Sequence, residues 1–268
     1  MIAVVLDWAG TTVDFGCMAP VDALLRVFNA DGVDITPAEA RADMGRAKLD
    51  HLRAILSAPA VVARWKVAKG GVPDEADVAR LYAALEPEMV AAAGRAASLI
   101  PGAAATVAAL RSQGIRIGSG TGYTRQMMEP VIAAARDQGY EPDVVICAGE
   151  TPSGRPSPLM TWAALIALDA YPAEACIKVD DAPVGILEGR CAGCWTVGLA
   201  ASGNGVGLPL AEYSALTESE KLKRSAVAAT ALQEAGADYV IDTIAELNVI
   251  VERIAARIAA GERPGSKA

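Results

Sequence analysis

The run Ile2-Ala-Val-Val-Leu-Asp7-Trp-Ala-Gly-Thr-Thr12 near the start of the chain decides the expected fold. Residues 2–6 are all apolar, several of them β-branched, and the run ends abruptly in a carboxylate and a glycine-containing loop. Uninterrupted apolar runs of this kind are typical of strands in a parallel sheet that is covered on both faces. The run therefore predicts a buried strand with Asp7 at its carboxyl end.

Further apolar runs follow along the chain and alternate with helical patterns rich in alanine and leucine. This alternation predicts an α/β fold with a doubly wound, Rossmann-like parallel sheet. In such sheets the ligand site lies beyond the carboxyl ends of the strands. The further expected strands are residues 115–118, 144–147, 176–179, 195–199 and 239–241, and the expected helices between them are 103–112, 124–138, 158–168, 184–192 and 244–260.

Residues 17–98 interrupt this alternation with helical patterns alone. Two of them begin with good helix-start signals, Thr36-Pro37 and Pro73-Asp74-Glu75. We therefore expect residues 1–16 and 99–268 to form an α/β core domain, and residues 17–98 an inserted, all-helical cap domain that acts as a lid. The expected hinges are Gly16 and residues 98–102, and the expected cap helices are 20–30, 36–43, 48–56, 60–67 and 75–93.

The composition excludes several classes of partner. The chain has 268 residues, 53% of them hydrophobic, and a formal net charge of −8. This charge repels nucleic acid and anionic membrane surfaces, although a few local cations could still hold a small anion. No apolar stretch is long enough for a transmembrane helix, and no basic segment marks a signal peptide. The cysteines form no even disulfide framework, so we expect free thiols and a cytoplasmic location.

Carboxylates follow two of the expected strands. Asp7 could be a nucleophile toward phosphorus and a hard ligand for Mg²⁺, or it could merely cap the next helix. Asp180 and Asp181 follow the strand at 176–179 and could converge with Asp7 on one divalent cation, or form a capping pair in a surface loop. Burying the carboxylates together without a cation would be costly, which favours a metal site.

Groups suited to a phosphoryl anion lie in neighbouring loops. Thr11 offers a hydroxyl and an open backbone beside Asp7, and Ser119 and Thr121 offer hydroxyls after the strand at 115–118. Arg155 could add bidentate contacts, or remain a solvated loop residue.

Lys48 is the most informative residue of the cap. An amine shielded beneath a lid would be nucleophilic toward carbonyl groups, whereas the plain alternative is a solvated lysine on a helix. His51 lies three residues further on and shares its helical face.

Together these residues resemble the haloacid dehalogenase superfamily, in which an Asp after the first strand, a Ser or Thr after the second, a basic residue and an acidic pair form the site. Phosphatases of that superfamily carry a second Asp two residues after the nucleophile, where it protonates an alcohol leaving group. This chain has Ala9 at that position, which argues against simple phosphate-ester hydrolysis.

The string Asp7-Trp-Ala-Gly-Thr-Thr-Val-Asp14, with Met44-Gly45 and Lys48-Leu-Asp-His51, resembles the phosphonoacetaldehyde hydrolase (phosphonatase) family. The resemblance covers nearly the whole chain and implies a Mg²⁺-dependent hydrolysis of the C–P bond of phosphonoacetaldehyde, in the degradation of 2-aminoethylphosphonate. Further matching segments are 117–124, 154–156 and 188–198.

The resemblance also implies a role for each site residue. Asp7 would accept the phosphoryl group, and Lys48 would form a Schiff base with the aldehyde. Asp7, the Ala9 carbonyl and Asp181 would bind Mg²⁺. Thr121, or Ser119 as the alternative, and Arg155 would hold the phosphoryl group near Thr11, while Met44, His51 and Tyr123 would line the site and assist proton transfer.

Two features leave alternatives open. Some relatives carry an Asp four residues after the metal-binding Asp, where this chain has Gly185, and Asp180 could compensate for it. The family resemblance implies a homodimer through the cap helices, for which Val61, Val62 and Trp65 could supply the contact. A phosphatase or dehalogenase of the same superfamily, or a protein that kept the fold without catalysis, are the rival interpretations.

Overall fold

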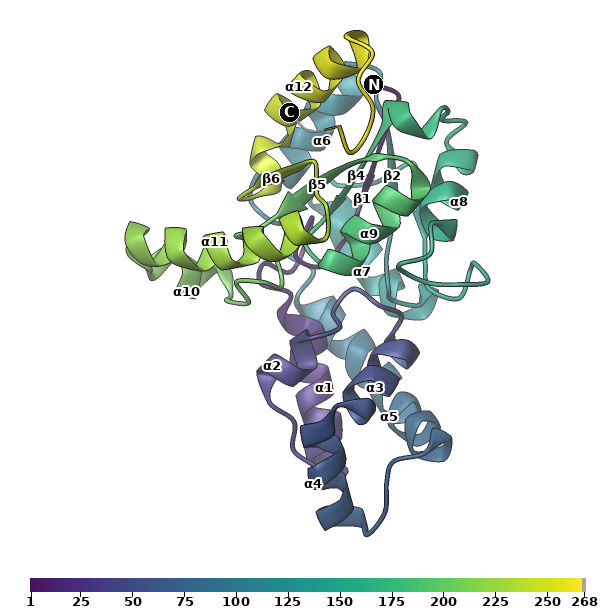
Figure 1. The fold of residues 1–268 in the computed structure, drawn as a ribbon, viewed down its shortest axis with the longest axis vertical. Coiled ribbons are helices and arrows are strands. Elements are labelled where there is room, and N and C mark those ends of the chain that lie inside the picture. Colours follow the sequence, from purple (N-terminus) through teal and green to yellow (C-terminus); the bar gives the residue numbers. More distant parts are fainter. Residues whose placement is uncertain (267–268) are drawn as a thin grey trace.

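A computed structural model describes residues 1–266 of the chain. At its centre six parallel strands form one sheet in the order β3-β2-β1-β4-β5-β6. This is the strand order of a Rossmann-like sheet, so the predicted doubly wound core is confirmed (Figure 1). The strands are β1 (Ala3–Leu6), β2 (Arg116–Gly120), β3 (Val144–Ile146), β4 (Cys176–Asp180), β5 (Trp195–Leu199) and β6 (Tyr239–Ile241).

Helices cover both faces of this sheet, because side chains along a strand point alternately to opposite sides. Val4 and Leu6 of β1 pack with apolar residues of α6, α7 and α12. Ala3 and Val5, which point the other way, pack with α8, and α9 and α11 cover β4, β5 and β6 on that face. The core helices are α6 (Ala103–Ser112), α7 (Arg125–Asp137), α8 (Leu159–Ala167), α9 (Pro183–Ala192), α10 (Leu210–Ala215), α11 (Glu218–Glu234) and α12 (Leu247–Ala259), with short 3-10 helices η1 (Ala173–Ala175) and η2 (Ile244–Glu246).

The register of the central strands brings the candidate site residues together. Leu6 of β1 is the register partner of Ser119 in β2 and of Val179 in β4. The residues that follow, Asp7 and Asp180, therefore lie side by side at the carboxyl edge of the sheet.

An all-helical cap is inserted between β1 and α6 and lies below the sheet in Figure 1. Its long helix α5 packs along α1 and α3, and also against α7 of the core. Reciprocal capping boxes at Thr36 and Asp74 begin α2 and α5, satisfying N–H groups that have no partner within the helix. The cap helices are α1 (Met18–Ala30), α2 (Pro37–Arg41), α3 (Lys48–Ser57), α4 (Pro59–Lys69) and α5 (Glu75–Arg95).

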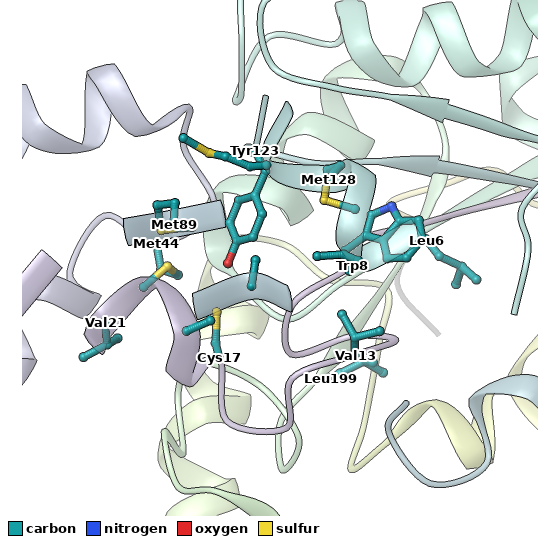
Figure 2. Close-up of a cluster of buried hydrophobic side chains, with 14 of the residues drawn as sticks. Leu6, Trp8, Val13, Cys17, Val21, Met44, Met89, Tyr123, Met128 and Leu199 are labelled. Atoms are coloured by element: carbon teal, nitrogen blue, oxygen red, sulfur yellow. The ribbon is translucent and has the colours of Figure 1, made fainter. Parts of the chain in front are cut away.

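Apolar side chains of the cap and the core form one continuous cluster. Figure 2 shows the part where Met44 and Met89 of the cap lie beside Tyr123 of the core, with Trp8 and Met128 deeper in the core. The cap is therefore packed onto the edge of the sheet where Asp7 lies.

The structure corrects the predicted contact of a homodimer. Val61 and Trp65 are buried in the chain's own hydrophobic cluster, at 0% and 1% exposure, because α4 turns them inward. Val62 is only partly exposed. Two of the three residues are thus unavailable to a second subunit, and the interpretation of Val61 and Trp65 as contact residues is wrong.

Most predicted elements are present, with small shifts at their ends. Strand β2 extends two residues further than expected, so Ser119 lies inside it. Helices α10 and α11 were not among the expected elements, although the capping box of Thr217 and Glu220 marks the start of α11. None of the helices within residues 1–266 is long and apolar enough to cross a membrane.

Candidate active site

Asp7 directly follows β1, and its carboxylate is almost fully buried. Its backbone N–H donates to the carbonyl of Val179 at 3.0 Å, and Thr12 Oγ1 donates to its carbonyl at 3.1 Å, so both strand and loop fix its position. The next helix, α1, is instead capped by Asp14, whose carboxylate accepts hydrogen bonds from backbone N–H groups in the first turn of that helix. The alternative interpretation of Asp7 as a helix cap is therefore wrong.

Asp7, Asp180 and Asp181 form a compact acidic cluster, each offering an oxygen within 4.8 Å of the others. Burial, followed by the charge of Asp180, raises the pKa of Asp7 to about 6. Burial and the charge of Asp7 raise the pKa of Asp181 well above its usual range. For Asp180 the effect of burial is outweighed by the nearby charges of Arg155 and Lys178, which lower its pKa.

This cluster fits a divalent metal ion. Asp7 and Asp181 are destabilised as anions by burial and by the neighbouring carboxylates of the cluster, and a bound cation would remove that cost. Their oxygens are the hard ligands that Mg²⁺ prefers. Ala9 lines the same cavity as Asp7 and Asp181, which agrees with the predicted place of its carbonyl as a further oxygen ligand.

Arg155 is the central cation of the site, and its side chain is only 1% exposed. Its Nη2 donates to Asp7 Oδ1 at 2.7 Å and to the Gly120 carbonyl at 2.9 Å. Its Nε donates to Glu188 Oε2 at 2.9 Å. The alternative of a solvated loop arginine is wrong, because this guanidinium is fixed against the candidate nucleophile.

Sequence reasoning missed two charged residues that support the site. Lys178, in the middle of β4, lies 2.8 Å from Asp180 Oδ2 and 3.7 Å from Glu188 Oε2. Glu188 also accepts hydrogen bonds from the backbone and hydroxyl of Thr161 in α8. A lysine inside an otherwise apolar, buried strand was the available signal, since a buried charge requires partners.

Lys48 opens α3, and its side chain is buried beneath the cap. Its Nζ lies 3.8 Å from Met44 Sδ and 5.2 Å from the centre of the Tyr123 ring. Burial lowers the pKa of Lys48 to about 8, even though the charge of Asp7 acts in the opposite direction. The interpretation of Lys48 as a solvated helix lysine is therefore wrong.

Lys48 and Asp7 line the same small cavity, which has room for about 20 Å³ of solvent, roughly one water molecule. The cap therefore closes over the carboxyl edge of the sheet and excludes bulk water from both groups. The other predicted site residues around this cavity are Ala9, Met44, Thr121, Tyr123, Arg155 and Asp181, and Cys17, Gly45, Arg46 and Gly122 complete its wall.

Three predicted site residues do not line this cavity. Ser119 Oγ donates to the Leu6 carbonyl at 2.9 Å and serves the sheet. Thr11 is fully buried, and its hydroxyl has no hydrogen-bond partner among residues 1–266. His51 lies behind Lys48 with both ring nitrogens unpartnered among those residues, and burial lowers its pKa well below the usual range. Of the two hydroxyl candidates, Thr121 is the one in the cavity wall.

The hydroxyl of Tyr123 and the thiol of Cys17 face the same region. Figure 2 shows the Tyr123 ring descending toward Cys17. The Tyr123 hydroxyl has no hydrogen-bond partner among residues 1–266, and burial raises the pKa of both groups well above their usual ranges. Both are therefore protonated at neutral pH. The position of Cys17 was not predicted, because its environment depends on the packing of the cap.

The fold and this arrangement of carboxylates define a class of protein. A model of the haloacid dehalogenase-like hydrolases matches residues 1–193, and the chain is an enzyme of this class.

Individual relatives identify the family within this class. The chain is 45% identical over 262 residues to the phosphonoacetaldehyde hydrolase of Paraburkholderia phytofirmans, covering 98% of each chain. It is 45% identical over 264 residues to that of Salmonella gallinarum, with the same coverage. A crystal structure of a phosphonoacetaldehyde hydrolase-like protein from Oleispira antarctica matches with a TM-score of 0.97 and 40% identity, covering 98% of this chain and 95% of that one. The chain belongs to the phosphonoacetaldehyde hydrolase family.

Proposed function

We propose that the chain hydrolyses the C–P bond of phosphonoacetaldehyde to acetaldehyde and phosphate, as a step in the degradation of 2-aminoethylphosphonate. The observation that carries this proposal is the enclosure of the Lys48 amine and the Asp7 carboxylate in one cavity, with Ala9 beside them. An ester phosphatase has no use for a buried amine at this place. The names of the relatives support the same substrate.

The reaction begins at Lys48. Because its pKa is lowered to about 8, a useful fraction of the amine is neutral near neutral pH and can attack the aldehyde carbon. Loss of water then gives a protonated imine. The hydroxyl of Tyr123, whose ring centre lies 5.2 Å from Lys48 Nζ, assists the proton transfers that this condensation requires.

The imine solves the problem of the leaving group. Breaking a C–P bond directly would expel a carbanion, which is far less stable than an alkoxide. With the imine in place, the electron pair of the C–P bond moves into the C=N⁺ group and forms a neutral enamine. No acid is needed at the leaving group, which accounts for Ala9 at the position of the usual Asp.

Asp7 accepts the phosphoryl group as the C–P bond breaks. One of its carboxylate oxygens forms the new bond to phosphorus, giving an aspartyl phosphate that water then hydrolyses to phosphate. Arg155, already bonded to Asp7, and Thr121 hold the phosphoryl oxygens and neutralise their charge. Protonation of the enamine carbon and hydrolysis of the resulting imine release acetaldehyde and restore Lys48.

We extend the proposal to Mg²⁺, held by Asp7, the Ala9 carbonyl and Asp181. When bound, the ion supplies charge neutralisation that lets a carboxylate approach an anionic phosphoryl group. Removal of the metal by EDTA should abolish phosphate release, and added Mg²⁺ should restore it. Activity that survives exhaustive chelation would contradict this part of the proposal.

We assign residues 1–16 and 99–268 to the core domain and 17–98 to a mobile cap, with hinges at Gly16 and 98–102. The small volume of the cavity, about 20 Å³, supports this assignment, because the cap must move to make room for the substrate. Two further parts of the proposal follow the resemblance alone, namely a homodimer through the cap helices and a cytoplasmic location. Light scattering of the purified protein tests the first of these.

Trapping with borohydride tests the central step. Phosphonoacetaldehyde and borohydride together should leave a reduced two-carbon adduct on Lys48, identified by peptide mass spectrometry. The variant Lys48→Met, which keeps the side-chain volume, should fold, lose phosphate release and form no adduct. An active Lys48→Met enzyme would show that the imine is not required, and phosphate release from simple esters without an adduct would favour an ester phosphatase.

A further inference from the structure

Arg41 is the last residue of helix α2 in the cap, and its side chain reaches across to the core. Its Nη1 donates to the Gly16 carbonyl at 2.9 Å and to Asn204 Oδ1 at 3.0 Å, and its Nη2 donates to the Gly207 carbonyl at 3.1 Å. These acceptors come from the hinge and from the loop after β5. One planar guanidinium thus joins the cap, the hinge and the core.

Asn204 both donates a hydrogen bond to Arg41 and accepts one from it. Its side-chain amide donates to the Arg41 carbonyl at 3.2 Å while its Oδ1 accepts from the guanidinium, so the two residues bond reciprocally. Its backbone N–H donates to Asp181 Oδ2 at 2.7 Å. The same residue therefore contacts the cap with its side chain and the candidate metal ligand with its backbone.

The loop around Asn204 is shaped to admit the guanidinium. A Cβ at Gly207 would lie 2.8 Å from Arg41 Cζ, so only glycine leaves enough room. The same loop also contacts the hinge and the loop that follows Asp7. The Gly16 N–H donates to the Ser202 carbonyl at 2.7 Å, and Ser202 Oγ donates to the Gly10 carbonyl at 2.8 Å. Arg41 thus inserts into a loop that is fixed on its other side to the catalytic edge of the sheet.

We propose that Arg41 and Asn204 are positioning residues that couple the closed cap to the orientation of the metal-binding carboxylate of Asp181. The proposal rests on the function proposed above, because it takes Asp181 as a metal ligand and the cap as a lid. When the cap opens, Arg41 leaves the loop, and Asn204 loses the partner that orders its side chain. The hydrogen bond from the Asn204 backbone N–H, which fixes the Asp181 carboxylate, then weakens as well.

The chemistry of the contact explains why an arginine stands at this position. Its acceptors are uncharged oxygens and the sulfur of Met18, placed in several directions, which suits the rigid fork of a guanidinium and not the single ammonium of a lysine. Hydrogen bonds from a charged donor are among the stronger ones in proteins. Losing them should shift the equilibrium between closed and open cap by about tenfold or more.

The variants Arg41→Ala, Arg41→Lys and Asn204→Ala test the proposal by two measurements that need no phosphonate. The first is the rate at which pyridoxal 5′-phosphate and borohydride label Lys48, followed by peptide mass spectrometry, which reports opening of the cap. The second is the affinity for Mg²⁺ measured by titration calorimetry. Each variant should be labelled about tenfold faster and should bind Mg²⁺ several-fold more weakly.

Arg64→Ala is the matched control. Arg64 is also a half-exposed cap arginine bonded to a carbonyl and a side chain, but its partners, Asp34 and Glu39, both belong to the cap. It should leave labelling of Lys48 and Mg²⁺ affinity unchanged. If Arg41→Ala proves unstable, Arg41→Lys and Asn204→Ala make the same test with smaller changes.

The proposal requires both faster labelling of Lys48 and weaker binding of Mg²⁺ in the variants. Variants that melt at lower temperature but label at the wild-type rate and keep their Mg²⁺ affinity would show that the pair only stabilises the fold. Faster labelling with unchanged affinity would likewise overturn the coupling to Asp181. Neither measurement uses phosphonoacetaldehyde. The test therefore stays valid if the proposed reaction fails, and failure of the coupling can be told apart from failure of the reaction.

Discussion

The carboxylate of Asp180 occupies the space that a side chain at position 185 would need. A Cβ built on Gly185 would lie 2.0 Å from Asp180 Cγ and 2.0 Å from its Oδ2. That carboxylate is fixed, because Lys178 Nζ and the Ala182 N–H both donate to it. That Asp180 compensates for the Asp expected at position 185 from the resemblance stays a prediction, and the clash shows that the two side chains would compete for the same space.

The substitution Gly185→Ala should therefore destabilise the protein and reduce activity. Alanine in place of a helical glycine contributes up to about 1 kcal/mol of stability. Overpacking against a fixed group costs about 1–3 kcal/mol, so the collision with Asp180 should win. Urea unfolding and phosphate release measure the two effects. Gly94→Ala in α5 is the control, because its Cβ would meet only Pro130 at an ordinary 3.5 Å; equal behaviour of the two variants would contradict the argument.

The pH dependence of Schiff-base formation should follow the Lys48 amine. Because burial lowers its pKa to about 8, the protonated, unreactive form dominates below that pH. The trapping rate should rise about tenfold per pH unit up to pH 7, bend near 8, and level off above it. An exposed lysine would keep rising toward pH 10. A trapping rate that still climbs tenfold per unit at pH 9 would mean that the amine is not held in the buried position.

Thr121 and Ser119 should separate into a binding role and a structural role. Thr121 lines the cavity, whereas the Ser119 hydroxyl is used up on the Leu6 carbonyl. Thr121→Val should raise KM several-fold and also lower stability by about 1 kcal/mol, because the Thr121 hydroxyl accepts a hydrogen bond from the Tyr123 N–H at 3.2 Å. Ser119→Ala should leave KM unchanged and lower stability by about 1 kcal/mol through the lost buried hydrogen bond. Steady-state kinetics and chemical unfolding on both variants decide between them, and the opposite assignment of effects would contradict this reading of the cavity.

The central strands could be predicted because their residues carry a local signal. Unbroken apolar runs such as residues 2–6 are typical of strands in a sheet covered on both faces, and the parallel register then places Asp7 and Asp180 side by side. The resemblance to a known family supplied Lys48, for which the residues alone favoured a solvated side chain.

The hydrogen-bond partners of the supporting residues could not be predicted, since these contacts depend on packing between distant segments. Glu188 and Arg155 are 33 residues apart in the chain, and no local pattern joins them. The cap contact of Arg41 with Asn204 spans 163 residues. The mistaken assignment of Trp65 to a dimer contact has the same origin, because an apolar residue on a helix does not show whether it packs against its own chain or against another.

The buried lysine of β4 gives the last prediction. Lys178 is fully buried between Asp180 and Glu188, so Lys178→Met would remove one of the two buried cations that these carboxylates share and leave them only Arg155. Breaking a buried pair on one side costs about 3–5 kcal/mol, more than the gain from burying an apolar side chain of similar size. Urea unfolding should show this loss. Arg53→Met removes an exposed cation that bonds Asp50 and Glu75 in the cap, and it should leave unfolding almost unchanged, because solvent screens such pairs. If Lys178→Met were as stable as Arg53→Met, the charges around Arg155 would not form the interdependent network that holds the site.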